Sequence, residues 1–153
     1  MHLPKQLFRT RLLGKISMVA ILIMGIACNK TTVSLSSREQ TVQYLTGTGN
    51  RYWKIRELYI NGVQQTLTSA QLDYWKVYTV PIGDPDAPGS FSTMDGYIGS
   101  WELTQPDQIT ERILNLPNGP VSYLLKILKL GTYEMDVEYT ANGVVTRTVY
   151  FAN

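Results

Sequence analysis

The sequence predicts an all-β fold, an antiparallel meander of eight or nine strands closed into a barrel. Turn pairs such as Asn61-Gly62 and Asn142-Gly143 recur at short intervals, and the segments between the turns are rich in Val, Ile, Thr, Tyr and Trp. A meander of this length must protect its edge strands, and closure into a barrel removes them. A two-sheet β-sandwich is the alternative, because periodicity does not separate the two architectures.

The predicted elements follow the turn signals along the chain. Asn-Gly pairs favour tight hairpins because both residues tolerate positive φ. Residues 68–71 predict one helical turn between the second and third strands. The predicted strands cover residues 51–60, 62–67, 73–80, 90–94, 97–104, 108–116, 121–130, 132–140 and 144–152.

The segment 132–140 (TYEMDVEYT) has the clearest two-residue period. One face carries three acidic side chains, which we interpret as a solvated outer face, and the other carries Tyr133, Met135, Val137 and Tyr139. This pattern is typical of a half-buried antiparallel strand. The preceding segment 121–130 (VSYLLKILKL) is apolar on both faces and suits a barrel or sandwich interior, although a helix could produce the same pattern.

The N-terminus has the pattern of an export signal. Residues 1–15 contain four basic residues and no acidic residue, and residues 16–27 form a mostly apolar run that is too short to span a membrane as a helix. The run ends in small residues, Gly25 and Ala27, directly before Cys28. This pattern resembles the lipobox of bacterial lipoproteins. The resemblance implies that Cys28 becomes the first mature residue and carries lipid, so that the membrane is one partner of the protein.

These signals divide the chain into three parts. We expect a lipoprotein signal peptide over residues 1–27, a lipidated cysteine and flexible tether over 28–43, and a β-barrel domain over 44–153. We expect the protein to be anchored in the outer membrane of a Gram-negative bacterium, and the sequence leaves both the periplasmic face and the cell surface open.

Composition excludes several classes of function. From residue 28 onward the chain carries 10 basic and 12 acidic residues, so the high isoelectric point of the whole sequence comes from its N-terminus. His2 is the single histidine and Cys28 the single cysteine. These counts argue against His-dependent catalytic triads, zinc sites and structural disulfides, and the charge argues against nucleic-acid binding. We expect no cofactor and no metal, and because no pair of carboxylates stands out we expect no enzyme activity.

Short motifs in the domain resemble a known family. They are LTG at residues 45–47, WKI at 53–55, NG at 61–62 and GSWEL at 99–103. Together they are similar to the lipocalin-like domain of small Gram-negative lipoproteins, over roughly residues 44–152. The resemblance implies an antiparallel β-barrel and no agreed ligand.

The first and last strands become neighbours if the barrel closes. Each has an otherwise apolar face with one charge, Glu57 in the first strand and Arg147 in the last. In lipocalins a tryptophan of the first strand packs on an arginine of the last strand at one end of the barrel, and Trp53 and Arg147 resemble that pair. Glu57 is a candidate buried charge that could instead neutralise Arg147.

Two binding hypotheses follow. In the first, a small hydrophobic ligand binds non-covalently in the barrel mouth, lined by Trp53, Tyr59, Tyr133, Met135 and Tyr139. In the second, side chains fill the barrel and the protein is a structural or assembly lipoprotein. Its exposed aromatic side chains would then dock an envelope protein or glycan. A cavity of about 300 Å³ or more would support the first hypothesis.

Overall fold

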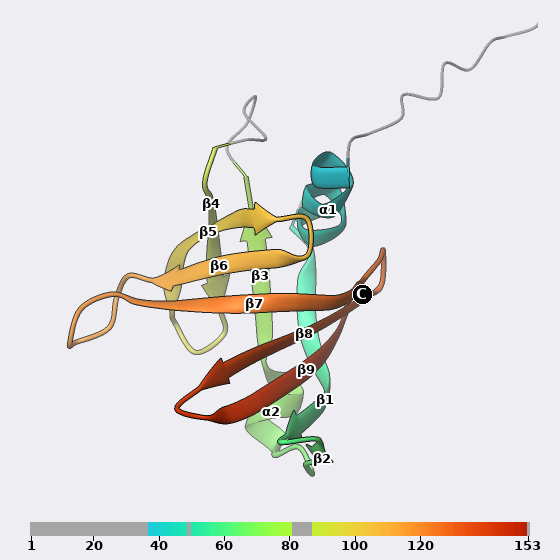
Figure 1. The fold of residues 1–153 in the computed structure, drawn as a ribbon, viewed down its shortest axis with the longest axis vertical. Coiled ribbons are helices and arrows are strands. Elements are labelled where there is room, and N and C mark those ends of the chain that lie inside the picture. The colour runs from blue at the N-terminus through green and yellow to red at the C-terminus, as the bar shows by residue number, and fades with distance from the viewer. Residues whose placement is uncertain (1–36, 49, 81–86, 153) are drawn as a thin grey trace, which may run out of the picture. The chain divides into compact units, whose positions relative to one another are not determined.

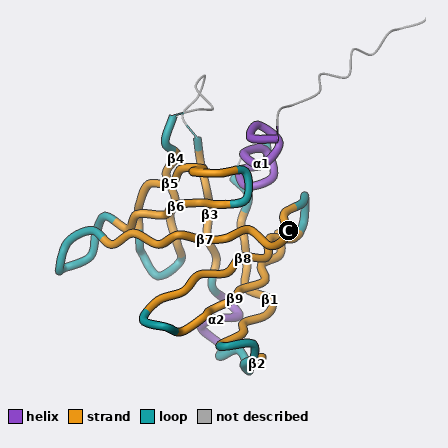
Figure 2. Tube along the Cα trace, in the orientation of Figure 1, coloured by secondary structure: helices purple, strands orange, loops and turns teal. Residues whose placement is uncertain are grey.

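The computed structural model describes residues 37–48, 50–80 and 87–152, and strands make up most of this part of the chain (Figures 1 and 2). The elements in order are α1 (Ser37–Thr46), β1 (Tyr52–Ile60), β2 (Val63–Gln64), α2 (Ser69–Asp73), β3 (Trp75–Thr79), β4 (Gly89–Thr93), β5 (Ile98–Gln105), β6 (Gln108–Ile113), β7 (Val121–Leu130), β8 (Glu134–Ala141) and β9 (Val144–Ala152). These positions confirm the predicted succession of strands.

The sheet closes on itself. Each strand from β3 to β9 pairs antiparallel with its neighbour, and β1 pairs with β3 on one side and with β9 on the other. Strands β1 and β3–β9 therefore form a closed eight-stranded barrel, and the short β2 extends one edge of β1. The predicted barrel is confirmed over the alternative of a β-sandwich.

Two Asn-Gly turns form the expected tight hairpins. Asn61 and Gly62 have φ of 48° and 80°, and Asn142 and Gly143 have φ of 50° and 77°. Positive φ at both central residues matches the turn type whose twist suits a two-residue hairpin. The Asn61 side chain also accepts a hydrogen bond from the Val145 amide at 2.9 Å, which links the first turn to the start of β9.

The helix α1 covers one end of the barrel. Its Val42 and Leu45 are buried in the core, and the Leu45 carbonyl oxygen accepts a hydrogen bond from Trp53 Nε1 at 2.8 Å. Arg38 adds a hydrogen bond to the Leu103 carbonyl oxygen at 2.9 Å. The expected tether over residues 28–43 is therefore wrong from Ser37 onward, because this segment folds onto the barrel through two apolar residues three positions apart.

The second helix lies at the opposite end, near β2 (Figure 1). Thr68 caps α2, and a reciprocal pair of hydrogen bonds with Gln71 forms a capping box. The predicted helical turn is confirmed and extends to Asp73. Strand β1 pairs with β3 only over residues 52–54 and with β2 only over 59–60, and α2 also contacts β1.

Candidate ligand-binding site

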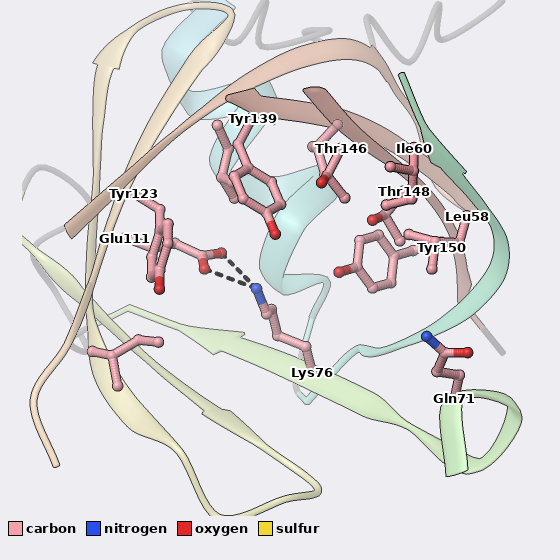
Figure 3. Close-up of a pocket in the computed structure, with 13 residues that line it drawn as sticks. Leu58, Ile60, Gln71, Lys76, Glu111, Tyr123, Tyr139, Thr146, Thr148 and Tyr150 are labelled. Carbon is pink, nitrogen blue, oxygen red and sulfur yellow. Dashed lines mark hydrogen bonds and ion pairs between the residues drawn. The ribbon is translucent and has the colours of Figure 1, made fainter. Parts of the chain in front are cut away.

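A pocket occupies the barrel at the end away from α1. Its volume is about 400 Å³. Its walls are inward-facing side chains of β1, β3 and β6–β9, together with one residue of α2 (Figure 3). These lining residues are Leu58, Ile60, Gln71, Lys76, Glu111, Ile113, Tyr123, Leu125, Val137, Tyr139, Thr146, Thr148 and Tyr150.

Strand alternation explains why the lining combines these residues. Successive side chains of a strand point to opposite faces, so Thr146, Thr148 and Tyr150 of β9 share the inner face. Their partners in the register of β8 are Tyr139, Val137 and Met135. Toward α1 the inner face is packed solid with Trp53, Tyr78, Ile109, Met135 and Leu45, each less than 2% exposed. The pocket therefore ends on a filled apolar core.

A buried ion pair forms the inner part of the pocket. Lys76 Nζ lies 2.9 Å from Glu111 Oε1 and 2.8 Å from Oε2, and the two side chains are 10% and 6% exposed. The Tyr78 hydroxyl also donates to Glu111. The ammonium lies 5.4 Å from the centre of the Phe91 ring. Burying two charges is costly and rarely stabilises a fold, so such a pair marks a candidate functional site.

Burial and charge shift the pKa values of this cluster. Burial lowers the pKa of Lys76, but the Glu111 carboxylate beside it has the opposite effect, and the pKa ends well above its ordinary value. Burial, reinforced by Glu111, raises the pKa of the Tyr78 phenol well above its ordinary value, and burial likewise raises the pKa of Tyr150. At neutral pH the site therefore holds an ammonium and neutral phenols.

Hydroxyl groups surround the ammonium. The hydroxyls of Tyr139 and Tyr150 point toward Lys76 Nζ, and Thr146 and Thr148 lie on the same wall (Figure 3). The Tyr139 ring is held against Tyr123 in an edge-to-face contact, with 5.7 Å between ring centres. The inner part of the pocket therefore offers fixed donors and acceptors for a polar group.

The outer part of the pocket is largely apolar. Leu58, Ile60 and Ile113 line it near the strand ends. A second pocket of about 260 Å³ adjoins it through the shared residue Gln71. Large apolar side chains at this end of the barrel are exposed as well: Val63, Leu72, Met94, Tyr97, Ile98, Leu114, Val121 and Val144. The apolar part of a ligand could therefore contact apolar side chains both in the outer part of the pocket and around its opening.

The expected lining residues fall in three different places. Tyr139 lines the pocket as expected. Trp53 and Met135 face inward, but both are fully buried in the core toward α1. Tyr59 and Tyr133 were wrongly placed, because Tyr59 lies on the outer face and Tyr133 is 72% exposed just before β8 begins.

A bulge in β1 explains the error at Tyr59. The register with β9 shifts between Ile55 and Glu57, so Arg56 is the extra residue. Side chains before the bulge and after it therefore exchange faces, and Glu57 points outward with Tyr59. The Tyr59 hydroxyl donates to Glu57 at 2.7 Å, and the Glu57 side chain is 31% exposed. Glu57 is not the buried charge that the sequence led us to expect.

The prediction that Trp53 packs on Arg147 is also wrong. In the register of the sheet, Arg147 lies opposite Tyr59 whereas Trp53 lies opposite Ala152. The Arg147 guanidinium lies 4.9 Å from the centre of the Tyr59 ring and 2.6 Å from Asp136. Asp136, expected to be solvated, is only 6% exposed, because this ion pair covers it on the outer face.

Lys76 and Glu111 were not predicted as site residues, although the sequence carries a signal for both. Lys76 falls between Tyr74 and Tyr78 at the two-residue period of β3, and Glu111 falls between Ile109 and Ile113 in β6. Each is a single charge on an otherwise apolar face. The same criterion had selected Glu57 and Arg147 as candidates. It failed for Glu57 because no sequence signal located the bulge in β1, after which the side chains lie on the opposite face.

Comparisons with known proteins give a likeness in structure and none in sequence family. No family model and no curated protein matches the chain. The chain is similar to a solved lipocalin-like protein from Bacteroides uniformis, with 18% sequence identity and a TM-score of 0.41. The match covers 71% of this chain and 97% of that protein.

Metal sites and membrane-spanning helices can be assessed only in the described residues, which are 37–48, 50–80 and 87–152. Within that part of the chain, no group of three or more His, Cys, Asp or Glu side chains could hold a metal ion. Neither of its helices is long and apolar enough to cross a membrane. The signal peptide, Cys28 and the first residues of the tether lie outside the described residues.

Proposed function

We propose that the protein binds a small molecule with an apolar body non-covalently in the barrel pocket. The observation that supports this proposal is the pocket itself, because a closed barrel of eight strands has room either for its own side chains or for one small ligand. About 400 Å³ remains free here, within the usual range for ligand pockets. The driving force would be burial of apolar ligand surface, worth about 25 cal/mol per Å².

The proposal places this barrel on a lipid anchor. The basic N-terminus, the short apolar run and Cys28 support processing as a lipoprotein of the outer membrane. Acyl labelling in cells tests this part separately: Cys28→Ala should abolish labelling and release the protein from membranes. Labelling that persists in the variant would refute the anchor and leave the binding proposal unaffected.

The alternative is an assembly role through exposed aromatic side chains. Tyr52, which is 44% exposed, packs edge-to-face on Trp75 with 5.3 Å between ring centres on the outer face of β1 and β3. Such a pair could dock a protein or glycan. The open pocket favours the binding proposal over this one, since the alternative supposes a filled barrel.

A filling variant tests the binding proposal. Thr146→Phe places an aromatic ring in the pocket, and Val145→Phe places the same ring on the outer face of the same strand. We expect the uncharged dye N-phenylnaphthylamine to gain fluorescence with the wild-type protein and with Val145→Phe, and to lose binding with Thr146→Phe. Equal dye binding by all three proteins would show that the dye binds elsewhere and would contradict the proposal.

A further inference from the structure

The charge balance of the pocket restricts what it can accept. Among the described residues that line it, Lys76 and Glu111 alone carry a formal charge, and each neutralises the other. A carboxylate brought to Lys76 would also meet the Glu111 carboxylate, and an ammonium brought to Glu111 would meet Lys76. A charged ligand must therefore separate the pair and leave one charge buried without a partner, which is strongly unfavourable.

An uncharged polar group meets no such penalty. An ammonium has three N–H donors, and the two oxygens of Glu111 account for two of them. The hydroxyls of Tyr139 and Tyr150 point to the same place and can each donate or accept (Figure 3). A hydroxyl or carbonyl oxygen of a ligand can therefore bond to Lys76 and a phenol without disturbing the ion pair.

The arrangement also sets the direction of the ligand. The ion pair lies toward the filled core, since Lys76 is the register partner of the buried Trp53. The apolar side chains of Leu58, Ile60 and Ile113 lie toward the open end, where Gln71 and Thr146 are the uncharged polar side chains of the lining. A ligand that entered with its apolar part first would bury that part against the ion pair and leave its polar end among apolar side chains. The polar end therefore enters first.

We propose that the pocket selects an uncharged amphipathic molecule whose hydroxyl or carbonyl group lies against the Lys76–Glu111 pair and whose apolar body extends toward the open end. This inference rests on the proposed function and names the ligand class for the same site. Lys76 and Glu111 act in it as a charge filter that rejects fatty acids and alkyl amines of the same length.

The test compares three molecules with the same apolar chain and different head groups. Decanol, decanoate and decylammonium each compete with N-phenylnaphthylamine for the full-length protein at neutral pH. We expect decanol to displace the dye at concentrations roughly 100-fold lower than either ion, since each ion must break the buried pair. Decanoate that competes as well as decanol would overturn the inference.

A matched pair of variants tests the filter itself. Glu111→Gln leaves Lys76 without a counter-charge, so decanoate should bind at least about tenfold more tightly than to the wild-type protein. Glu102→Gln removes one negative charge from the outer face of the neighbouring strand and should leave the ranking unchanged. If decanoate binds Glu111→Gln no better than wild type, the filter is refuted.

The failure of the proposed function gives a different result. A wild-type protein that takes up no dye and none of the three molecules overturns binding in the pocket altogether, and the inference falls with it. A protein that binds the dye but ranks decanoate first retains the binding function and loses only the charge filter. The wild-type ranking decides by itself if Glu111→Gln does not fold.

Discussion

The buried ion pair makes a sharp prediction about stability. Lys76 and Glu111 are 10% and 6% exposed, with Nζ and Oε2 2.8 Å apart. Replacing either partner by an apolar residue of similar size leaves the other charge buried and alone. We therefore expect Lys76→Met and Glu111→Leu each to lower the free energy of unfolding by about 3–5 kcal/mol.

The double variant should behave differently. Replacing both partners removes both desolvation costs, and such replacements are neutral or stabilise proteins by about 1–4 kcal/mol. In this protein the gain is offset because the Tyr78 hydroxyl loses its acceptor, at a cost of about 1–3 kcal/mol. The double variant should therefore lie within about 3 kcal/mol of the wild-type protein.

Urea unfolding followed by far-ultraviolet circular dichroism measures all three variants, and a double-mutant cycle gives the coupling. Tyr78→Phe, measured in parallel, gives the contribution of the Tyr78 hydroxyl to the free energy of unfolding. A double variant that loses as much stability as the sum of the two single variants would contradict this expectation, because the charges would then contribute independently and favourably to the fold.

Three further outcomes follow from the core and its turns. Burial raises the pKa of Tyr78 and Tyr150, so the stability that comes from keeping these phenols neutral is present below about pH 10 and is lost as the pH rises through their folded-state values. Phenolate absorbance should therefore show these groups ionising together with alkaline unfolding, and ionisation with the exposed tyrosines would be the contrary result. Trp53→Phe removes the hydrogen bond to the Leu45 carbonyl of α1, so it should lower the free energy of unfolding by about 1–3 kcal/mol and weaken hydrogen-exchange protection in that helix. Unchanged protection would show that this hydrogen bond does not hold α1 on the barrel. Gly99→Ala would drive a methyl group into a backbone carbonyl of β6 and an aromatic ring of β4, and it should lower the free energy of unfolding by about 1–3 kcal/mol. Gly131→Ala is the control, because its methyl group meets open space. Equal urea midpoints for the two variants would contradict this packing.

The strand order was predictable because turn chemistry is local. Asn61-Gly62 and Asn142-Gly143 specify hairpins by their backbone preferences alone, and the segments between turns have the composition of strands. The face of the sheet on which a residue lies is not determined by local sequence alone, since one bulged residue reverses every side chain that follows it in the strand. Arg56 does so in β1 and shifts Glu57 and Tyr59 to the outside.

The helix α1 and the ion pair needed tertiary contacts to be recognised. Val42 and Leu45 are too few to give α1 an apolar period that stands out, and the helix is fixed by the barrel end that it covers. Lys76 and Glu111 are 35 residues apart in the sequence, and only the closed sheet brings them together. Their separate positions on apolar faces were visible, but their pairing was not.

Native mass spectrometry of the protein purified from its own cells shows whether the barrel pocket holds a ligand. We expect the wild-type protein to carry an extra mass that leaves on denaturation and belongs to an uncharged molecule with an apolar body. Thr146→Phe should lack this mass, and Val145→Phe should retain it. A wild-type protein without any bound mass, or a mass that persists when the pocket is filled, would contradict the claim that the barrel pocket holds the ligand.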